Sequence, residues 1–203
     1  NPDDPNDTAL LEMIDGHISN LARALRTNNS ERAAFEAAWM AHAITDGLTP
    51  AHHFPLEQAM AELRGGEGLE TRTSILKKNL MKGENGIELI KNNWKFWGAK
   101  GMMTTHVAFE AGVASVVAYP RFKDAIPSND EILQVKNHGY REYYLSQVHA
   151  VTSMKMYDNF SKSGWTTDLA WQTNHELMPI IIKSVMLGWL ASIWKLEAEK
   201  SES

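Results

Sequence analysis

Cysteine is absent from the 203 residues of this chain. Neither a disulfide framework nor a thiolate metal site can therefore form, so any metal ligands must be histidine, aspartate or glutamate. Basic clusters are lacking too, because no block of lysine and arginine is longer than a pair and the formal net charge is -5. The sequence thus lacks the electrostatic footprint of a protein that binds duplex DNA stably or docks on an anionic membrane surface.

Signs of several domains are also missing. The chain has no internal repeat, no low-complexity linker and no period-two alternation long enough for a strand. Hydrophobic residues make up 43% of it and charged residues 22%, as in an ordinary globular protein. We predict one domain over residues 1–203, irregular at 1–7. The opening NPDDPNDT is polar and proline-rich, unlike a signal peptide, and would suit a chain whose leader has been removed.

Apolar residues recur at the helical period along nearly the whole chain, which predicts an all-α, multi-helix bundle. One apolar stripe runs from Leu10 to Leu25, and a second includes Phe35, Trp39 and Met40. We expect both stripes to face the core. The predicted helices cover about 8–26, 30–48, 55–64, 69–81, 86–97, 102–118, 130–160 and 167–199.

Two helix starts carry the spacing of a capping box. Asn28 stands three residues ahead of Glu31, and Ser128 stands three residues ahead of Glu131. In a capping box the first side chain accepts from a backbone N–H of the first turn, and the acidic side chain bonds back. The spacing therefore predicts well-defined helix starts after both residues.

The C-terminal run LMPIIIKSVMLGWLASIW has about the length of a membrane span. Lys183 within it and Pro179 near its start favour a buried helix that closes the bundle, without a transmembrane segment. Proline lacks the N–H that a helix interior needs, so we expect Pro179 to kink or divide this helix.

Two histidine–acid pairs have the spacing of a metal clamp. His42 and Asp46 are four residues apart, as are His106 and Glu110, so each pair can point at one place from one helix face. Pro50 ends the first helix, and His52 then lies on a turn back toward a neighbouring helix. Two imidazoles and a carboxylate are a usual zinc set, so His52, His106 and Glu110 are the predicted centre.

The motif HAITDGLTPAHH resembles the signature of the zinc-dependent phospholipase C and single-strand-specific zinc nuclease superfamily. His42, Asp46, Pro50 and His52 match that signature position for position, and His106 with Glu110 matches its downstream ligand pair. The resemblance implies an all-helical fold and cleavage of a phosphodiester by one to three zinc ions. It also implies a small substrate, either a phospholipid head group or a nucleotide, and a secreted or periplasmic location.

The upstream part of the chain departs from this family. The first residue is Asn1, where the family has a metal-binding tryptophan, and no further histidine or aspartate lies between His17 and His42. Asp15 and His17 are then the nearest candidates to complete a second site with His42 and Asp46. Fewer than three ions are expected for this reason. Asp46 is the predicted catalytic residue, either bridging two ions or orienting the attacking water.

Two other functions remain open on the same residues. The chain could be a helical binding or scaffold domain that keeps an incomplete, non-catalytic metal site for stability. It could also hold iron in a site of oxygenase type with the same three ligands, although the all-helical pattern argues against that. The substrate, the metal identity and the oligomeric state are not determined by the sequence.

Two further groups have both structural and functional interpretations. His138, Glu142 and His149 return to one face of a continuous helix, where they could bind metal, act in catalysis or form a polar stripe. The preferred interpretation is that they hold the second nitrogens of metal-bound histidines. Trp94 and Trp97 could stack a base or hold a lipid head group. Their place on a helix leading into a glycine favours core packing instead.

Overall fold

In the computed structural model, residues 8–120, 122–123 and 125–201 are described, and within these ranges the chain forms helices and turns without a strand. The all-α prediction is confirmed, while the predicted irregular segment 1–7 lies outside the described residues. The elements in chain order are α1 Ala9–Arg26, α2 Ser30–Gly47, the 3-10 turn η1 Pro50–His53, α3 Leu56–Leu63, η2 Leu69–Thr71, α4 Ile75–Asn79, α5 Gly86–Trp97, α6 Met102–Val117, α7 Asn129–His138, α8 Tyr140–Ser153, α9 Met156–Ser163, α10 Thr167–Gln172, the π turn η3 Thr173–Leu177 and α11 Met178–Ser201.

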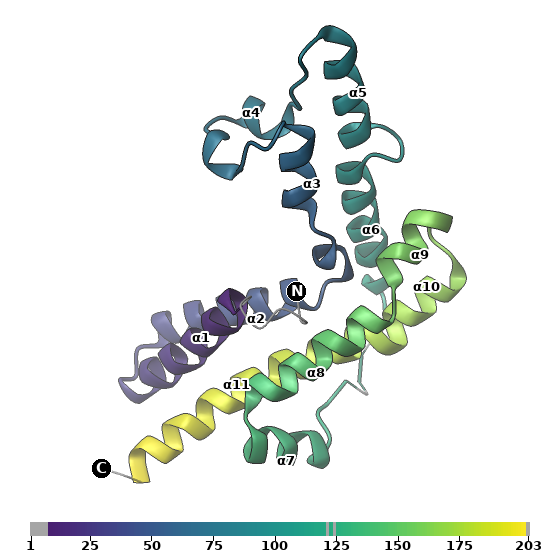
Figure 1. Cartoon of the computed structure of the whole chain (residues 1–203). Helices are drawn as coiled ribbons and strands as arrows, with labels where there is room; N and C mark the ends of the chain where they lie inside the picture. Colours follow the sequence, from purple (N-terminus) through teal and green to yellow (C-terminus); the bar gives the residue numbers. More distant parts are fainter. Residues whose placement is uncertain (1–7, 121, 124, 202–203) are drawn as a thin grey trace.

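The main core lies between α1, α2, α8 and α11 (Figure 1). Ile14, Met40 and Leu187 are fully buried there. Two tyrosines of α8 are buried as well and donate to carbonyls of neighbouring helices, Tyr140 to Ser184 at 2.8 Å and Tyr144 to Ile44 at 3.2 Å. These bonds satisfy the hydroxyl groups, which would otherwise be costly to bury.

The second predicted stripe is only partly buried. Met40 and Ala43 face the core, but the side chains of Phe35 and Trp39 are 49% and 47% exposed. The expectation that both aromatics pack inside is therefore wrong. The reason is that α1 and α11 cover the side of α2 that carries Met40 and Ile44, and no described helix covers the other side.

Two predicted helices are shorter than expected. The predicted helix 130–160 is three helices, because Gly139 and Lys155 both adopt positive φ, of 90° and 52°. The predicted helix 69–81 contains only η2 and the short α4. The capping box of Ser128 and Glu131 is confirmed. At the other predicted start the cap is Asn29 rather than Asn28.

A separate arm, defined here as residues 56–100, projects from the body (Figure 1) and contains α3, η2, α4 and α5. It has a small core of its own, made by Met60, Met81 and Phe96. Helix α6 leads from this arm back to the body, where the buried Phe109 packs against the ring of Trp165. The arm therefore adjoins the helix that carries His106 and Glu110.

Residues Thr167–Ala198, from α10 into α11, form a helix long and apolar enough to cross a membrane by length and composition alone. In the fold this helix packs against α1, α2, α7 and α8, and Leu177 and Leu187 are buried in the core. The irregularity predicted at Pro179 is present as the π turn η3, which ends at Leu177.

Candidate metal centre

His52, His106 and Glu110 converge in space. The Nε2 atoms of His52 and His106 each lie 3.1 Å from Oε1 of Glu110, and one ligand atom from each residue lies within 4.8 Å of the other two. Among the residues that the structure describes, no other three histidines, aspartates or glutamates meet this criterion. The predicted three-ligand set is thus brought together.

The turn after α2 explains how His52 reaches α6. Thr49 is extended, with φ -85° and ψ 116°, as expected for a residue before proline. Pro50 then starts η1, and its ring and Ala51 are buried. This turn lays the ring of His52 parallel to that of His106, with centroids 5.4 Å apart.

His52 faces an oxygen acceptor on each ring nitrogen. Its Nδ1 lies 3.1 Å from the backbone carbonyl of Asp46, and its Nε2 faces Glu110. A neutral imidazole has a single N–H and can donate to only one of these oxygens. The neutral ring therefore leaves one of its two nitrogens facing an oxygen without a hydrogen between them. With the Nδ1 hydrogen donated to the carbonyl, the lone pair of Nε2 points at the cluster, as in a metal-binding histidine.

The donor types suit zinc, and the two contacts to Glu110 have the spacing of zinc ligands. Ligand atoms about 2.0–2.1 Å from a tetrahedral zinc lie roughly 3.3 Å from one another, close to the 3.1 Å contacts here. The side chains of His52 and Glu110 are 34% and 43% exposed, while that of His106 is 13% exposed. Three ligands with one open side are typical of a catalytic rather than a closed structural site.

The ring of His106 is held by packing. Its Nδ1 is buried and has no hydrogen-bond partner among the described residues. The ring instead stacks on His52 and meets the ring of Tyr157 edge-on at 6.4 Å. Burial, with the nearby charge of Glu110 adding to it, raises the pKa of Tyr157, so its hydroxyl stays protonated at neutral pH.

His42 and Asp46 lie beside the cluster. Oδ2 of Asp46 is 3.3 Å from Nε2 of His42, and its Oδ1 is 3.8 Å from Nδ1 of His52. Asp46 thus contacts His52 through both its carboxylate and its backbone carbonyl. The structure brings this pair next to the three-ligand set but not into it.

Asp15 and His17 are engaged elsewhere. Nδ1 of His17 lies 2.5 Å from the carboxylate of Glu36, which is buried and also pairs with Arg32 at 2.5 Å. Asp15 lies 3.4 Å from Arg141 of α8. Because α1 packs along α2, His17 faces Glu36, and neither predicted upstream ligand joins His42. Nothing in the sequence pattern singled out Glu36 as the partner of His17.

The remaining histidines have structural partners or lie apart. The ring nitrogens of His53 lie 2.9 Å from the carbonyl oxygen of Gly47 and 3.1 Å from the hydroxyl of Thr152. Burial lowers the pKa of His53, which favours the neutral ring. His138 ends α7 and Glu142 lies in α8 beyond the break at Gly139, so the predicted continuous face is wrong.

Three comparisons with known proteins find no match: no protein-family model, no curated protein and no solved structure is similar to this chain.

Proposed function

We propose that the chain is a metal-dependent hydrolase of phosphodiester bonds, with zinc held by His52, His106 and Glu110. The observation that carries this proposal is the convergence of these three side chains from η1 and α6, with one open side. When bound, the ion would supply a water of lowered pKa and positive charge for the phosphate oxygens. A secreted or periplasmic location belongs to the same proposal and depends on the family resemblance alone.

Asp46 has two roles in this proposal. Its backbone carbonyl orients His52 by accepting from Nδ1, and its carboxylate, 42% exposed, lies 3.8 Å from the same Nδ1. In the proposal this exposed carboxylate beside the cluster accepts the proton of the attacking water. Nε2 of His42 lies 3.3 Å from the other carboxylate oxygen, so His42 helps to hold the carboxylate of Asp46 in position.

Metal content and activity test the proposal directly. Protein purified without a histidine tag should bind zinc and hydrolyse bis(p-nitrophenyl) phosphate. At free zinc about 100 times Kd, binding contributes about 2.7 kcal/mol to the free energy of unfolding, which raises Tm by roughly 5–10 °C for a chain of this size. Phosphatidylcholine and a single-stranded oligonucleotide, assayed in parallel, separate the two substrate classes.

Matched variants connect both readouts to the site. Glu110→Gln should abolish the zinc-dependent rise in Tm and the hydrolysis together. His138→Ala, at an exposed histidine outside the cluster, should change neither. Zinc content near zero with no shift in Tm would refute the proposal.

A binding or scaffold domain with a non-catalytic metal site is the second candidate. It is favoured by the pairing of His17 with Glu36 and of Asp15 with Arg141, because these contacts leave His42 and Asp46 without the upstream ligands of a second ion. Such a protein would bind zinc at the three-ligand set and gain stability. It would hydrolyse none of the phosphodiesters at any zinc concentration.

A further inference from the structure

Helix α5 turns its apolar side to solvent. Ile87, Ile90, Trp94 and Trp97 follow one another at helical spacing on one face, and their side chains are 82%, 69%, 71% and 46% exposed. The opposite face carries the buried Phe96. The prediction that both tryptophans pack in the core is therefore wrong. An exposed apolar face of this kind marks an interaction surface.

Helix α4 of the same arm also exposes apolar side chains. Ile75, Leu76 and Leu80 are 81%, 73% and 46% exposed. The two segments are joined where the indole N–H of Trp97 donates to the carbonyl of Asn79 at 2.7 Å. Exposed aliphatic and aromatic side chains thus occur on both α4 and α5, helices of the arm that lie away from α8 and α11 (Figure 1).

Lysines are interleaved with these apolar side chains. Residues 75–100 contain six lysines and two glutamates, and all six lysines are exposed. This segment is positive although the whole chain has a net charge of -5, and one of its lysines, Lys82, is paired with Glu67. The net charge of a whole chain does not show such a local excess of positive charge. The lysines are Lys77, Lys78, Lys82, Lys91, Lys95 and Lys100.

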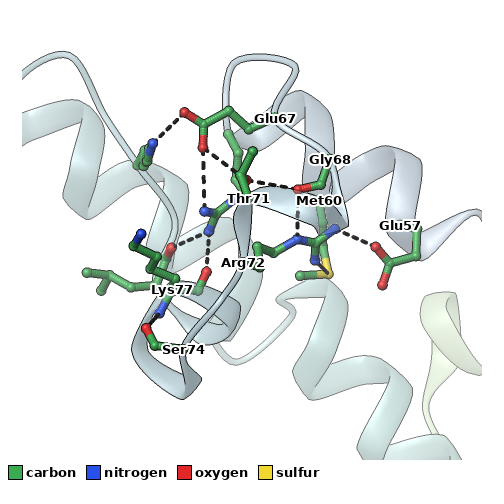
Figure 2. Close-up of polar contacts among 11 residues, drawn as sticks. Glu57, Met60, Glu67, Gly68, Thr71, Arg72, Ser74 and Lys77 are labelled. Atoms are coloured by element: carbon green, nitrogen blue, oxygen red, sulfur yellow. Dashed lines mark hydrogen bonds and ion pairs between the residues drawn. The ribbon is translucent and has the colours of Figure 1, made fainter.

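Two buried arginines hold α4 and the turns before it in place (Figure 2). Nη1 of Arg64 donates to the carbonyls of Lys77 and Leu80 at 2.6 and 2.8 Å, and Nη2 of Arg72 donates to Glu57 at 2.5 Å. Hydrogen bonds to charged donors are among the stronger ones in proteins. The exposed residues of α4 are therefore presented by an ordered segment.

We propose that this arm docks on the surface of an anionic lipid bilayer. Interfacial helices combine an apolar face of leucine, isoleucine and tryptophan with lysines that attract acidic head groups, as α4 and α5 do. A cavity of about 430 Å³ between α3 and the end of α5 is lined by Trp94, Lys95 and Lys100, together with Glu62. The two lysines place positive charge beside the exposed ring of Trp94.

Two other occupants fit less well. A second copy of the chain, seated face to face on the same arm, would set lysines against lysines. A single-stranded nucleic acid would use aromatic faces for stacking, but most exposed apolar residues here are aliphatic, such as Ile75 and Ile87. The proposal does not depend on hydrolysis, since the arm residues lie outside the metal cluster.

Sedimentation of the full chain with vesicles tests the proposal. Binding should be strong to phosphatidylcholine vesicles that contain phosphatidylserine, weak to phosphatidylcholine alone, and reduced by added salt. Each surface lysine contributes about 1 kcal/mol, so Lys77→Gln with Lys78→Gln should weaken binding roughly 10-fold to 30-fold. Lys155→Gln with Lys162→Gln, which removes two exposed lysines elsewhere, should weaken it far less.

The apolar contribution is tested in the same assay. Ile87→Ser with Trp94→Ser should abolish vesicle binding, while Leu133→Ser, also at an exposed position, should not. Glu110→Gln should bind vesicles like the unchanged protein, which separates this proposal from the hydrolase. Three results would overturn it: no binding to acidic vesicles, a dimer that only the Ile87 and Trp94 substitutions dissociate, or binding to a single-stranded oligonucleotide in place of vesicles.

Discussion

Gly47 is a position beside the site at which one added methyl group should be damaging. It ends α2, directly after Asp46. A Cβ at this position would lie 2.1 Å from the hydroxyl oxygen of Tyr144 and 2.4 Å from Cδ2 of Leu10. The end of Leu10 can rotate away, but Tyr144 is 1% exposed, so its ring has no free space to move into. We therefore expect Gly47→Ala to displace Tyr144.

The loss of stability expected for Gly47→Ala follows from the contacts of Tyr144 that change. Overpacking a buried ring costs about 1–3 kcal/mol, and pulling the hydroxyl of Tyr144 from the carbonyl of Ile44 leaves a buried donor unpaired at about 1–3 kcal/mol. Against this, replacing glycine by alanine in a helix stabilises the fold by at most about 1 kcal/mol. The free energy of unfolding should fall by roughly 1–5 kcal/mol, and Tm by roughly 2–20 °C at this chain length.

A double-mutant cycle measured by urea denaturation isolates the clash. Tyr144→Phe removes the obstructing oxygen and alone should cost about 1 kcal/mol, the worth of its hydrogen bond. In that background Gly47→Ala should cost much less, which gives a favourable interaction energy of about 1–2 kcal/mol.

Gly16→Ala is the matched control, because no atom lies within 4 Å of its added Cβ, and it should stabilise α1 by up to about 1 kcal/mol. Additivity of Gly47→Ala and Tyr144→Phe within about 0.5 kcal/mol would refute the reasoning.

Three further predictions follow from burial and close packing. Gly112→Ala would place a Cβ 1.6 Å from Nε1 of Trp165, so it should cost about 1–3 kcal/mol and shift tryptophan fluorescence. Burial raises the pKa of Tyr143 to about 12. The contribution of the neutral Tyr143 to the free energy of unfolding is therefore present below pH 10 and is lost as the pH rises to about 12, at up to ~1.4 kcal/mol per pH unit. In urea denaturation at several pH values, Tyr143→Phe should lose less stability over this range than the unchanged protein. Burial lowers the pKa of His53, so the contribution of the neutral His53 ring to the free energy of unfolding is present above about pH 6.5 and is lost on acidification. The denaturation midpoint of His53→Gln should therefore fall less between pH 7 and pH 5 than that of the unchanged protein.

The sequence by itself determined the features that depend on residues a few positions apart. The helical class follows from the 3.6-residue period of apolar residues, and the start of α7 follows from Ser128 and Glu131, whose capping bonds span one turn. The pairing of His106 with Glu110 follows from their four-residue spacing on α6. The turn after α2 follows from Pro50, which fixes its own backbone and that of Thr49. All of these are short-range effects.

Only the tertiary structure decided which elements meet. His52 reaches Glu110 across 58 positions, while His17, expected to bind metal, is held by Glu36 of the neighbouring helix. Trp94 lies on an apolar helix face that no described element covers. A local pattern shows which side of a helix is apolar and which side chains share a face, but the partner of that side depends on how distant segments pack. Packing of this kind arises from many weak contacts at once, and no single spacing in the sequence specifies it.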